Sequence, residues 1–422
     1  MTDRLSGKFI GFARTSQEGA RESFQYYQTV GKDEKRLVRA AFFMGITGGL
    51  LWYVLILYWN ATGFDSKEIG LIGGVGTGLG IATLVFSGYL ADKFGRKRLL
   101  ILGLLGNVAA FAMFLTEKNI AVFTVAYGLS SMSSSLVQPS SYALLASKAR
   151  PVKMKFLFSI QSFSNQVGLT LAAFTGIFAP GFLFGEYSVA ILDSYWYVFL
   201  VGAACAVAPI AFVLGVSEPP VAWKARRVNL GGPVRNLLIV YCVQNGIIGF
   251  GAALLIPWFP LIFKEGMDAN DAQVALMITL SNIAVAVGWF VVPRFAELRG
   301  PVMLVTVCQL ASVGFMVAIP FSPNLLAAAL LYTARSLLML VPIPVLNAYL
   351  MNIVKEDVRA SFYGLSALAW QAAFSGAYIL SGFLWADGYD SVVPFVACGV
   401  VYVVGTLLFF AYFRRISEPT GE

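Results

Sequence analysis

A single arginine, Arg335, lies inside a long apolar run at residues 325–353. If this run is a helix, Arg335 lies about 15 Å from its start. A lone charge at that depth of a bilayer costs about 2.5–3.5 kcal/mol, so it must face water or a partner. No acidic residue lies in the interior of an apolar run. Arg335 could therefore receive an anion through its fork of N–H donors, or be held by backbone carbonyls.

Amide and aromatic side chains near the middle of other apolar runs are further candidates for contacts with a solute. Amides can bind a polar ligand, but they also hold membrane helices together, and the sequence supports both roles equally. The aromatic side chains offer apolar surface. We predict that a substrate cavity is lined by Arg335 together with Asn165, Gln166, Asn245, Asn282, Gln371, Trp52, Tyr332 and Trp370.

Membrane helices must position these side chains. The chain has 422 residues, of which 58% are hydrophobic and 12% charged, and this balance is too apolar for a soluble domain. A spanning helix needs roughly 20 mostly apolar residues. We predict twelve spans, at residues 38–59, 70–91, 99–116, 120–146, 156–180, 195–215, 236–262, 271–293, 301–320, 325–353, 361–385 and 392–413.

The basic residues indicate the orientation of these spans. Of the 30 lysines and arginines, only Lys67, Lys118 and Lys264 fall in the loops on the side opposite the termini. Basic residues favour the cytoplasmic side, so we predict that both termini are cytoplasmic. The longest connector carries proline and glycine pairs and divides the spans equally. The predicted parts are a cytoplasmic segment 1–37, a six-helix bundle 38–215, a linker 216–235, a second bundle 236–415 and a tail 416–422.

A short charged turn recurs in each half of the chain. The segment 88–98 reads GYLADKFGRKR, in which Gly95 permits a tight turn and Asp92 can accept hydrogen bonds from a helix N-terminus. Positions in the first half have counterparts 205 residues later, and this constant offset indicates an internal repeat. The pairs are Gly88 and Pro293, Asp92 and Glu297, Gly95 and Gly300, Tyr127 and Tyr332, Pro139 and Pro344, and Phe158 and Tyr363.

The first turn resembles the loop between helices 2 and 3 of the major facilitator superfamily, G-x-L-a-D-r-x-G-r-k, and the resemblance covers about residues 38–415. It implies an all-helical membrane fold of twelve helices in two parallel six-helix repeats. It also implies a latch, in which Asp92 holds the N-terminus of helix 11 just after Arg359. Gly88, Gly95 and Arg96 belong to this latch, and the repeat predicts a weaker second copy at Glu297.

Several classes of function lack the residues that they need. The chain has no histidine, and its four cysteines lie singly in apolar runs, so we expect no metal site and no cofactor. Neither a nucleophile–base pair nor a nucleotide-binding loop is present, so we expect no enzyme and no nucleotide partner. Basic residues are not interleaved with aromatic ones, so we expect no nucleic-acid partner.

These observations together predict a monomeric transporter in the plasma membrane, which gives a small organic solute alternating access to a central cavity. The expected solute carries an anionic or polar group that reaches Arg335. Two alternatives stay open. One is an efflux transporter for hydrophobic compounds, in which Arg335 has a structural role. The other is a membrane receptor or scaffold that transports nothing, because a fold does not fix a function.

Overall fold

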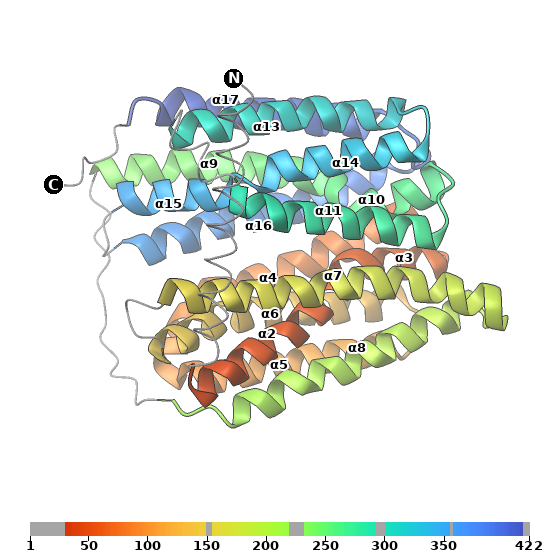
Figure 1. Ribbon diagram of the computed structural model, residues 1–422, viewed down its shortest axis with the longest axis horizontal. Helices are drawn as coiled ribbons and strands as arrows, with labels where there is room; N and C mark the ends of the chain where they lie inside the picture. Colours follow the sequence, from red (N-terminus) through yellow and green to blue (C-terminus); the bar gives the residue numbers. More distant parts are fainter. Residues whose placement is uncertain (1–29, 149–153, 219–231, 292–299, 355–357, 417–422) are drawn as a thin grey trace, which may run out of the picture.

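Every element in the described part of the chain is helical (Figure 1). The structure is a computed structural model that describes residues 30–148, 154–218, 232–291, 300–354 and 358–416. Within these ranges, 12 helical segments are long and apolar enough to cross a membrane. Each of the twelve predicted spans coincides with one of these segments, so this prediction is confirmed.

The first six spans form one half of the molecule. They are α2 (Lys32–Gly49) continued by η1 (Leu50–Val54) and α3 (Leu55–Ala61), α4 (Ser66–Phe94), α5 (Arg96–Phe114), α6 (Ile120–Lys148), α7 (Met154–Tyr187) and α8 (Ile191–Leu214). The helix α7 extends beyond its predicted end at residue 180, although Pro180 lacks a backbone donor. Stacked aromatic rings at Phe174, Phe178 and Phe182 pack along the helix across this position.

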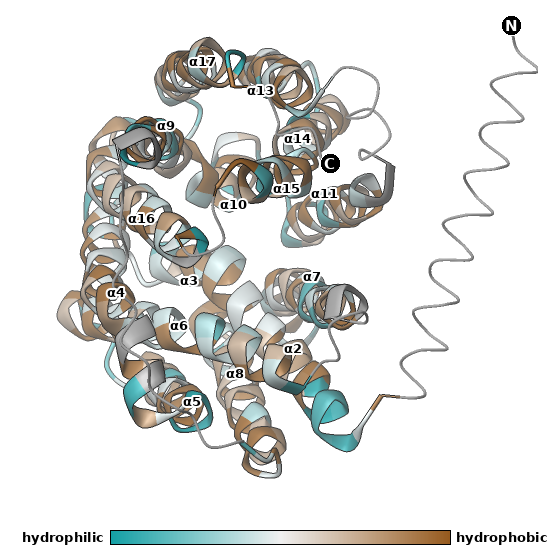
Figure 2. Cartoon of the chain, turned by 90° about the vertical axis from the view of Figure 1, so that its left-hand side faces the viewer, coloured by the Kyte–Doolittle hydropathy of each residue, from teal (hydrophilic) through white to brown (hydrophobic). Residues whose placement is uncertain are grey.

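The second six spans form the other half. They are α9 (Gly232–Leu255) with η3 (Ile256–Trp258), α10 (Phe259–Leu261) and η4 (Ile262–Gly266), then α11 (Asp271–Val291), α13 (Pro301–Ala318) with η5 (Ile319–Phe321), α14 (Leu325–Leu340) with α15 (Ile343–Ile353), α16 (Arg359–Leu384) and α17 (Val393–Phe413). Helices pack mainly within their own half, and the two halves meet along α4 with α16 and α7 with α11. Figure 2 shows this arrangement along the helix axes, with hydrophobic residues, in brown, on most of the helices at the outside.

The helices end at two opposite faces of the molecule. At one face α2 begins, α17 ends and the chain passes from α8 to α9, on the left in Figure 1, and we call it the terminal face. The opposite end, with the loops at 62–65 and 267–270, is the far face. Odd-numbered spans therefore run from the terminal face to the far face, and even-numbered spans run back.

The repeated turn has the same backbone conformation in both halves. Gly95 has a φ of 92° and immediately precedes α5, and Gly300 has a φ of 76° and immediately precedes α13. Residues other than glycine rarely have a positive φ in this range, because their Cβ atom would clash, and this explains the glycine in each copy. The conformation of this pair supports the internal repeat that the sequence predicts.

The helices α2 and α7 approach each other closely through glycines. A Cβ atom on Gly45 would lie 2.0 Å from the backbone oxygen of Asn165, and a Cβ atom on Gly168 would lie 2.0 Å from the backbone oxygen of Phe42. By contrast, a Cβ atom on Gly48, one turn further along α2, would meet nothing within 4 Å. The contact between the two helices therefore depends on the absence of a side chain at Gly45 and Gly168.

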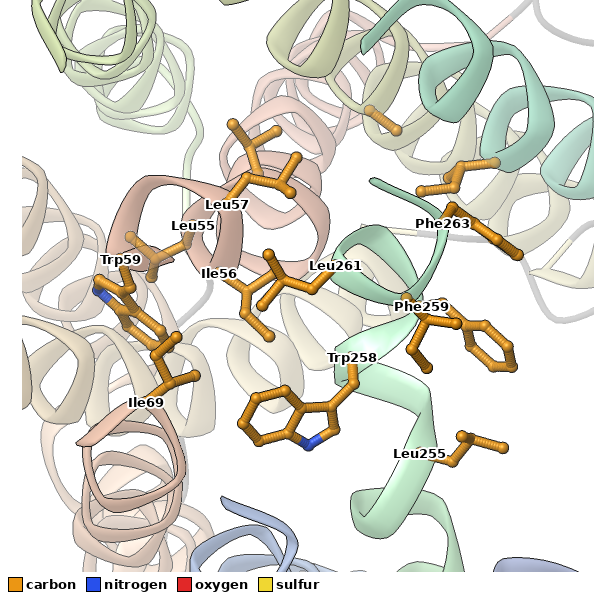
Figure 3. Packing of buried hydrophobic residues seen from close by; sticks show 14 of the residues in the cluster. Leu55, Ile56, Leu57, Trp59, Ile69, Leu255, Trp258, Phe259, Leu261 and Phe263 are labelled. Carbon is orange, nitrogen blue, oxygen red and sulfur yellow. The ribbon is translucent and has the colours of Figure 1, made fainter. Parts of the chain in front are cut away.

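A hydrophobic seal closes the far face between the two halves. Ile56 of α3 lies beside Leu261 of α10, with Trp258 close by (Figure 3). These three side chains and that of Leu57 are buried and belong to one hydrophobic cluster. Breaks in the α-helical pattern produce these surfaces, because η1 is a π-helical turn and η3 is a 3₁₀ turn beside Pro257. The seal therefore leaves any open space between the halves on the terminal-face side.

Polar contacts at the terminal face connect helices of the first half to one another and to Glu218, which follows α8. Glu218 accepts a hydrogen bond of 2.6 Å from the backbone nitrogen of Arg96, and the Arg96 guanidinium donates to the backbone oxygen of Ala143. Asp33 forms an ion pair of 3.1 Å with Lys148. The role of Glu218 was not predicted from the sequence.

The latch prediction falls partly on residues that the structure does not describe. Glu297 lies outside the described residues, as do the side chains of Gly88 and Asp92. The helix α16 begins at Arg359, whereas the prediction placed its start just after this residue, and the Nε of Arg359 donates a hydrogen bond of 3.0 Å to the backbone oxygen of Val354. The latch itself stays a prediction.

Candidate functional site: a cavity between the halves

A cavity of about 1150 Å³ lies between the two halves on the terminal-face side of the seal. Its lining extends from Trp52 and Phe374, close to the seal, to Tyr142, Asn347 and Tyr363 near the terminal face. The space is large enough for a small organic molecule. Both halves contribute to the walls, so a bound molecule would contact both.

Arg335 of α14 lies in the wall of this cavity and is 4% exposed. Its Nη2 donates a long hydrogen bond of 3.4 Å to the hydroxyl of Tyr402, and its Cζ lies 5.7 Å from the centre of the Phe259 ring. Its buried Nε has no hydrogen-bond partner among the described residues. The guanidinium therefore keeps most of its donors for a ligand.

Three amide side chains in the second half also line the cavity. Asn282 of α11 accepts a hydrogen bond of 3.2 Å from the hydroxyl of Tyr53, which belongs to the first half. Gln309 of α13 accepts one of 3.1 Å from Thr406 of α17. Gln244 of α9 is 3% exposed, and within the described ranges its Oε1 lacks a partner. These amides add polar groups to the cavity wall that Arg335 also lines.

An aromatic wall faces these polar groups. The rings of Trp370 and Phe374 are stacked with centroids 4.7 Å apart, and Trp52 is stacked on Phe374 at 6.2 Å. Trp52 is 38% exposed although it lies within a span, because its ring borders the cavity. This wall offers a flat apolar surface for a ring system.

Most of the predicted site residues lie together in the cavity wall. Its lining includes Arg335, Asn245, Asn282, Trp370, Gln371, Tyr332 and Trp52. Some of them are also used in packing, since Asn245 donates to the backbone oxygen of Ser366 and Gln371 donates to that of Thr77.

Asn165 and Gln166 lie elsewhere and are not among the lining residues. Asn165 donates a hydrogen bond of 3.1 Å to the backbone oxygen of Ala41, at the close contact of α7 with α2. Gln166 donates one of 3.4 Å to Thr170 on its own helix. Asn165 therefore takes part in the contact between α7 and α2, and Gln166 bonds to a residue of its own helix.

Several lining residues in the second half were not predicted from the sequence, above all Gln244, Gln309 and Tyr402. Gln244 precedes the predicted Asn245, and Gln309 is an isolated amide in an apolar run. An amide in the middle of a span is costly without a partner, and that signal could have identified both. Tyr402 carries no such signal, because a tyrosine is common in apolar helices.

No carboxylate lines the cavity in the part of the chain that the structure describes. The described acids nearest the far face form contacts there instead. Lys264 pairs with Asp271 at 2.6 Å, and Asn60 of the first half donates to Glu265 of the second at 3.3 Å. The charge of the described cavity wall is therefore that of Arg335 alone.

The membrane-length helices in two groups around a solute-sized cavity define a polytopic membrane protein of the secondary-transporter class. A family profile described as Major Facilitator Superfamily matches residues 37–246. The chain is 21% identical over 399 residues to the uncharacterized MFS-type transporter YqjV of Bacillus subtilis (strain 168), covering 87% of this chain and 90% of that protein. The chain belongs to the major facilitator superfamily and is a multi-pass membrane transporter.

Two further comparisons agree with this assignment. The chain is 24% identical over 395 residues to the multidrug resistance protein MdtH of Aeromonas hydrophila, covering 91% of this chain and 94% of that protein. The structure superimposes on the crystal structure of a D-xylose–proton symporter with a TM-score of 0.73, at 14% identity, covering 93% of this chain and 99% of that one. Because the identity to the symporter is only 14%, this similarity shows a shared fold and no more.

Proposed function

We propose that the protein transports a small organic anion with an apolar ring through the central cavity. The observation that carries this proposal is Arg335, a buried cation in the cavity wall whose Nε has no described partner. Burying an unpaired charge is costly, and a substrate anion would compensate it. The wall of Trp52, Trp370 and Phe374 would receive the apolar part of the same molecule.

Transport would occur by alternating access between the two faces. The far face is sealed, and the cavity lies on the terminal-face side, so the structure corresponds to one of the two required states. We place the terminal face in the cytoplasm of the cell, on the basic residues of its loops, and the protein in the plasma membrane. The structure would then be open toward the cytoplasm.

Export of hydrophobic compounds is the second candidate function. The aromatic wall favours it, and so does the name of the relative MdtH, a multidrug resistance protein. In that case Arg335 would hold Tyr402 and Phe259 in place without contacting the substrate.

A binding screen with matched probes separates these candidates. We expect purified protein to bind naphthalenesulfonate or naphthoate at least about tenfold more tightly than neutral naphthamide, the scale of one hydrogen bond to a charged group. Isothermal titration in detergent would measure the affinities. Binding of tetraphenylphosphonium and naphthamide, without binding of either acid, would favour export of hydrophobic compounds and contradict the anion proposal.

The latch supplies a second prediction. Asp92 at the end of α4 would stabilise the state that is closed at the terminal face, by about 0.3–2 kcal/mol, through the N-terminus of α16. The Asp92→Asn variant should therefore populate the state open at the terminal face more than the wild type, and Glu297→Gln should have a smaller effect. Spin labels at the exposed positions Ser147 and Asn352 would report the distance between the halves. An unchanged distance distribution in Asp92→Asn would rule the latch out.

A further inference from the structure

A second hollow lies on the outside of the second half, separate from the central cavity. It has a volume of about 450 Å³ and runs between α9, α16 and α17, which lie next to one another at the edge of the molecule (Figure 2). We call it the outer groove. Its lining is apolar throughout and includes Val243, Gly246, Phe250, Ala373, Val400 and Val404. In a membrane protein such an outward-facing groove meets the hydrocarbon of the bilayer.

The outer groove exists because Gly246 has no side chain. A Cβ atom on Gly246 would lie 3.5 Å from the backbone oxygen of Ala369 and 3.8 Å from the Cβ atom of Ala373, which are ordinary contact distances. One turn further along α9 the packing is tighter, since a Cβ atom on Gly249 would lie 2.7 Å from the backbone oxygen of Trp370. The helices could therefore accept a larger residue at position 246, and the glycine there leaves space.

Two arginines lie at the terminal-face end of the helices that form the outer groove. Arg235 is in the first turn of α9, Arg414 directly follows α17, and both are exposed. The rings of Tyr241 and Phe413 lie 6.2 Å apart and show how the two antiparallel helices are aligned. From this contact the two arginines are separated by about 8 Å along the helix axis.

Exposed side chains recur at helical spacing between each arginine and the outer groove. Residues three and four apart share one face of a helix, so the arginine and the groove residues of each helix lie on the same outward face. The exposed positions are Arg235, Ile239 and Val243 in α9, and Val400, Val404, Leu407 and Arg414 in α17.

The charges at this end have no described counterpart. Neither α9 nor α17 contains an acidic residue, and the ion pairs among the described residues involve neither Arg235 nor Arg414. The Cζ of Arg414 lies 5.2 Å from the centre of the Phe410 ring, a contact that uses none of its N–H donors. Both guanidinium groups can therefore bind an anion from outside the chain.

The distance from the arginines to the outer groove matches one leaflet of a bilayer. Counted along the helices, Val243 lies about 12 Å from Arg235, and Val404 lies about 15 Å from Arg414. Half of the hydrocarbon core of a bilayer is about 15 Å thick. A lipid with its head group at the arginines would therefore have its acyl chains beside the groove.

We infer that the outer groove and the two arginines bind an anionic phospholipid from the leaflet at the terminal face. Arg235 and Arg414 bind the phosphate group, and one acyl chain fills the space beside Gly246. A second copy of the chain fits this surface less well. A two-fold axis along the membrane normal would bring its own two arginines to the same end, where the like charges would repel one another. This inference goes beyond the proposed function and does not depend on the central cavity.

Native mass spectrometry of the full-length protein in detergent, titrated with lipid, tests the head-group contact. We expect dioleoylphosphatidylglycerol to bind about 5- to 30-fold more tightly than zwitterionic dioleoylphosphatidylcholine, because each arginine near the surface contributes about fivefold. Arg235→Gln and Arg414→Gln should each lower the affinity for phosphatidylglycerol about fivefold and leave that for phosphatidylcholine unchanged. Arg98 is an exposed arginine at the start of α5, so Arg98→Gln is the matched control and should bind both lipids as the wild type does.

A second pair of variants tests the acyl-chain contact. Gly246→Leu fills the outer groove and should weaken both lipids by at least about threefold, because the chain loses its packing contacts there. Gly314→Leu adds the same side chain to an exposed glycine of α13 with no atom within 4 Å of its Cβ position, and it should bind as the wild type does. Dihexanoylphosphatidylglycerol, whose chains are too short to reach position 246, should bind equally to the wild type and to Gly246→Leu.

Three results would overturn the inference, provided that every variant elutes as folded protein in size-exclusion chromatography. The first is equal affinity of the wild type for phosphatidylglycerol and phosphatidylcholine. The second is unchanged binding in Arg235→Gln and Arg414→Gln, or in Gly246→Leu. The third is a dimer of the wild type that binds no lipid and dissociates in Gly246→Leu, which would assign the groove to a second copy. Since none of these variants alters Arg335 or another residue of the central cavity, the proposed function would stand in each case.

Discussion

Replacing Arg335 with alanine is expected to weaken binding of naphthalenesulfonate by about 10- to 150-fold. This factor corresponds to about 1.5–3 kcal/mol, the contribution of a hydrogen bond to a charged group. The effect should be large because Arg335 is the only cation among the described lining residues and its Nε has no described partner. Arg335→Lys keeps the charge but not the planar fork, so it should restore part of the affinity.

Isothermal titration of the three proteins would measure these effects, with Ser134→Ala as a matched control. Ser134 also lines the cavity and is exposed to it, but it carries no charge. The control should therefore bind as the wild type does. Equal affinity in the wild type and in folded Arg335→Ala would show that Arg335 does not contact the anion, and its role would then be structural.

Replacing Gly45 with alanine is expected to destabilise the protein by about 1–3 kcal/mol, as overpacking does elsewhere. The new Cβ would lie 2.0 Å from the backbone oxygen of Asn165, which cannot rotate away as a side chain does. The helices α2 and α7 would have to separate, and the hydrogen bond from Asn165 to Ala41 would lengthen. Gly168→Ala should have a similar effect, since its Cβ would meet Phe42 from the other side.

The matched control lies on the same helix. Gly48→Ala adds the same methyl group where no atom lies within 4 Å, so its thermal stability should equal or exceed that of the wild type. Heating the detergent-solubilised proteins and measuring the remaining monodisperse fraction would compare them. If Gly45→Ala were as stable as Gly48→Ala, the close approach of α2 and α7 would be wrong.

The spans and the repeated turn could be predicted because each depends on local chemistry. A bilayer requires apolar runs of fixed length, and the turns at Gly95 and Gly300 require glycine for their positive φ. Arg335 could be predicted to face a cavity for a similar reason, since no charge is tolerated against lipid at that depth. Such requirements can be read from one segment alone.

The partner of each helix face could not be predicted in the same way. The sequence identifies Asn165 as an amide near the middle of an apolar run, but the glycines at 45 and 168 decide that α2 approaches it. Gln309 illustrates the opposite case, because its helix lies at the edge of the bundle and the cavity still reaches it. Both outcomes depend on contacts between segments far apart in the sequence.

The π-helical turn η1 sets the angular position of everything that follows it in the first span. A π turn holds one residue more than an α turn, and one residue rotates a helix by about 100°. Ile56 lies beside Leu261 across the seal (Figure 3), and the additional residue at Leu50–Val54 sets the angle at which it does so. Without it the hydropathy of the span would be almost unchanged, but the Ile56 side chain would be rotated by about 100°, away from Leu261. One inserted residue therefore decides which side chains close the far face, although it hardly changes how well the span fits the membrane.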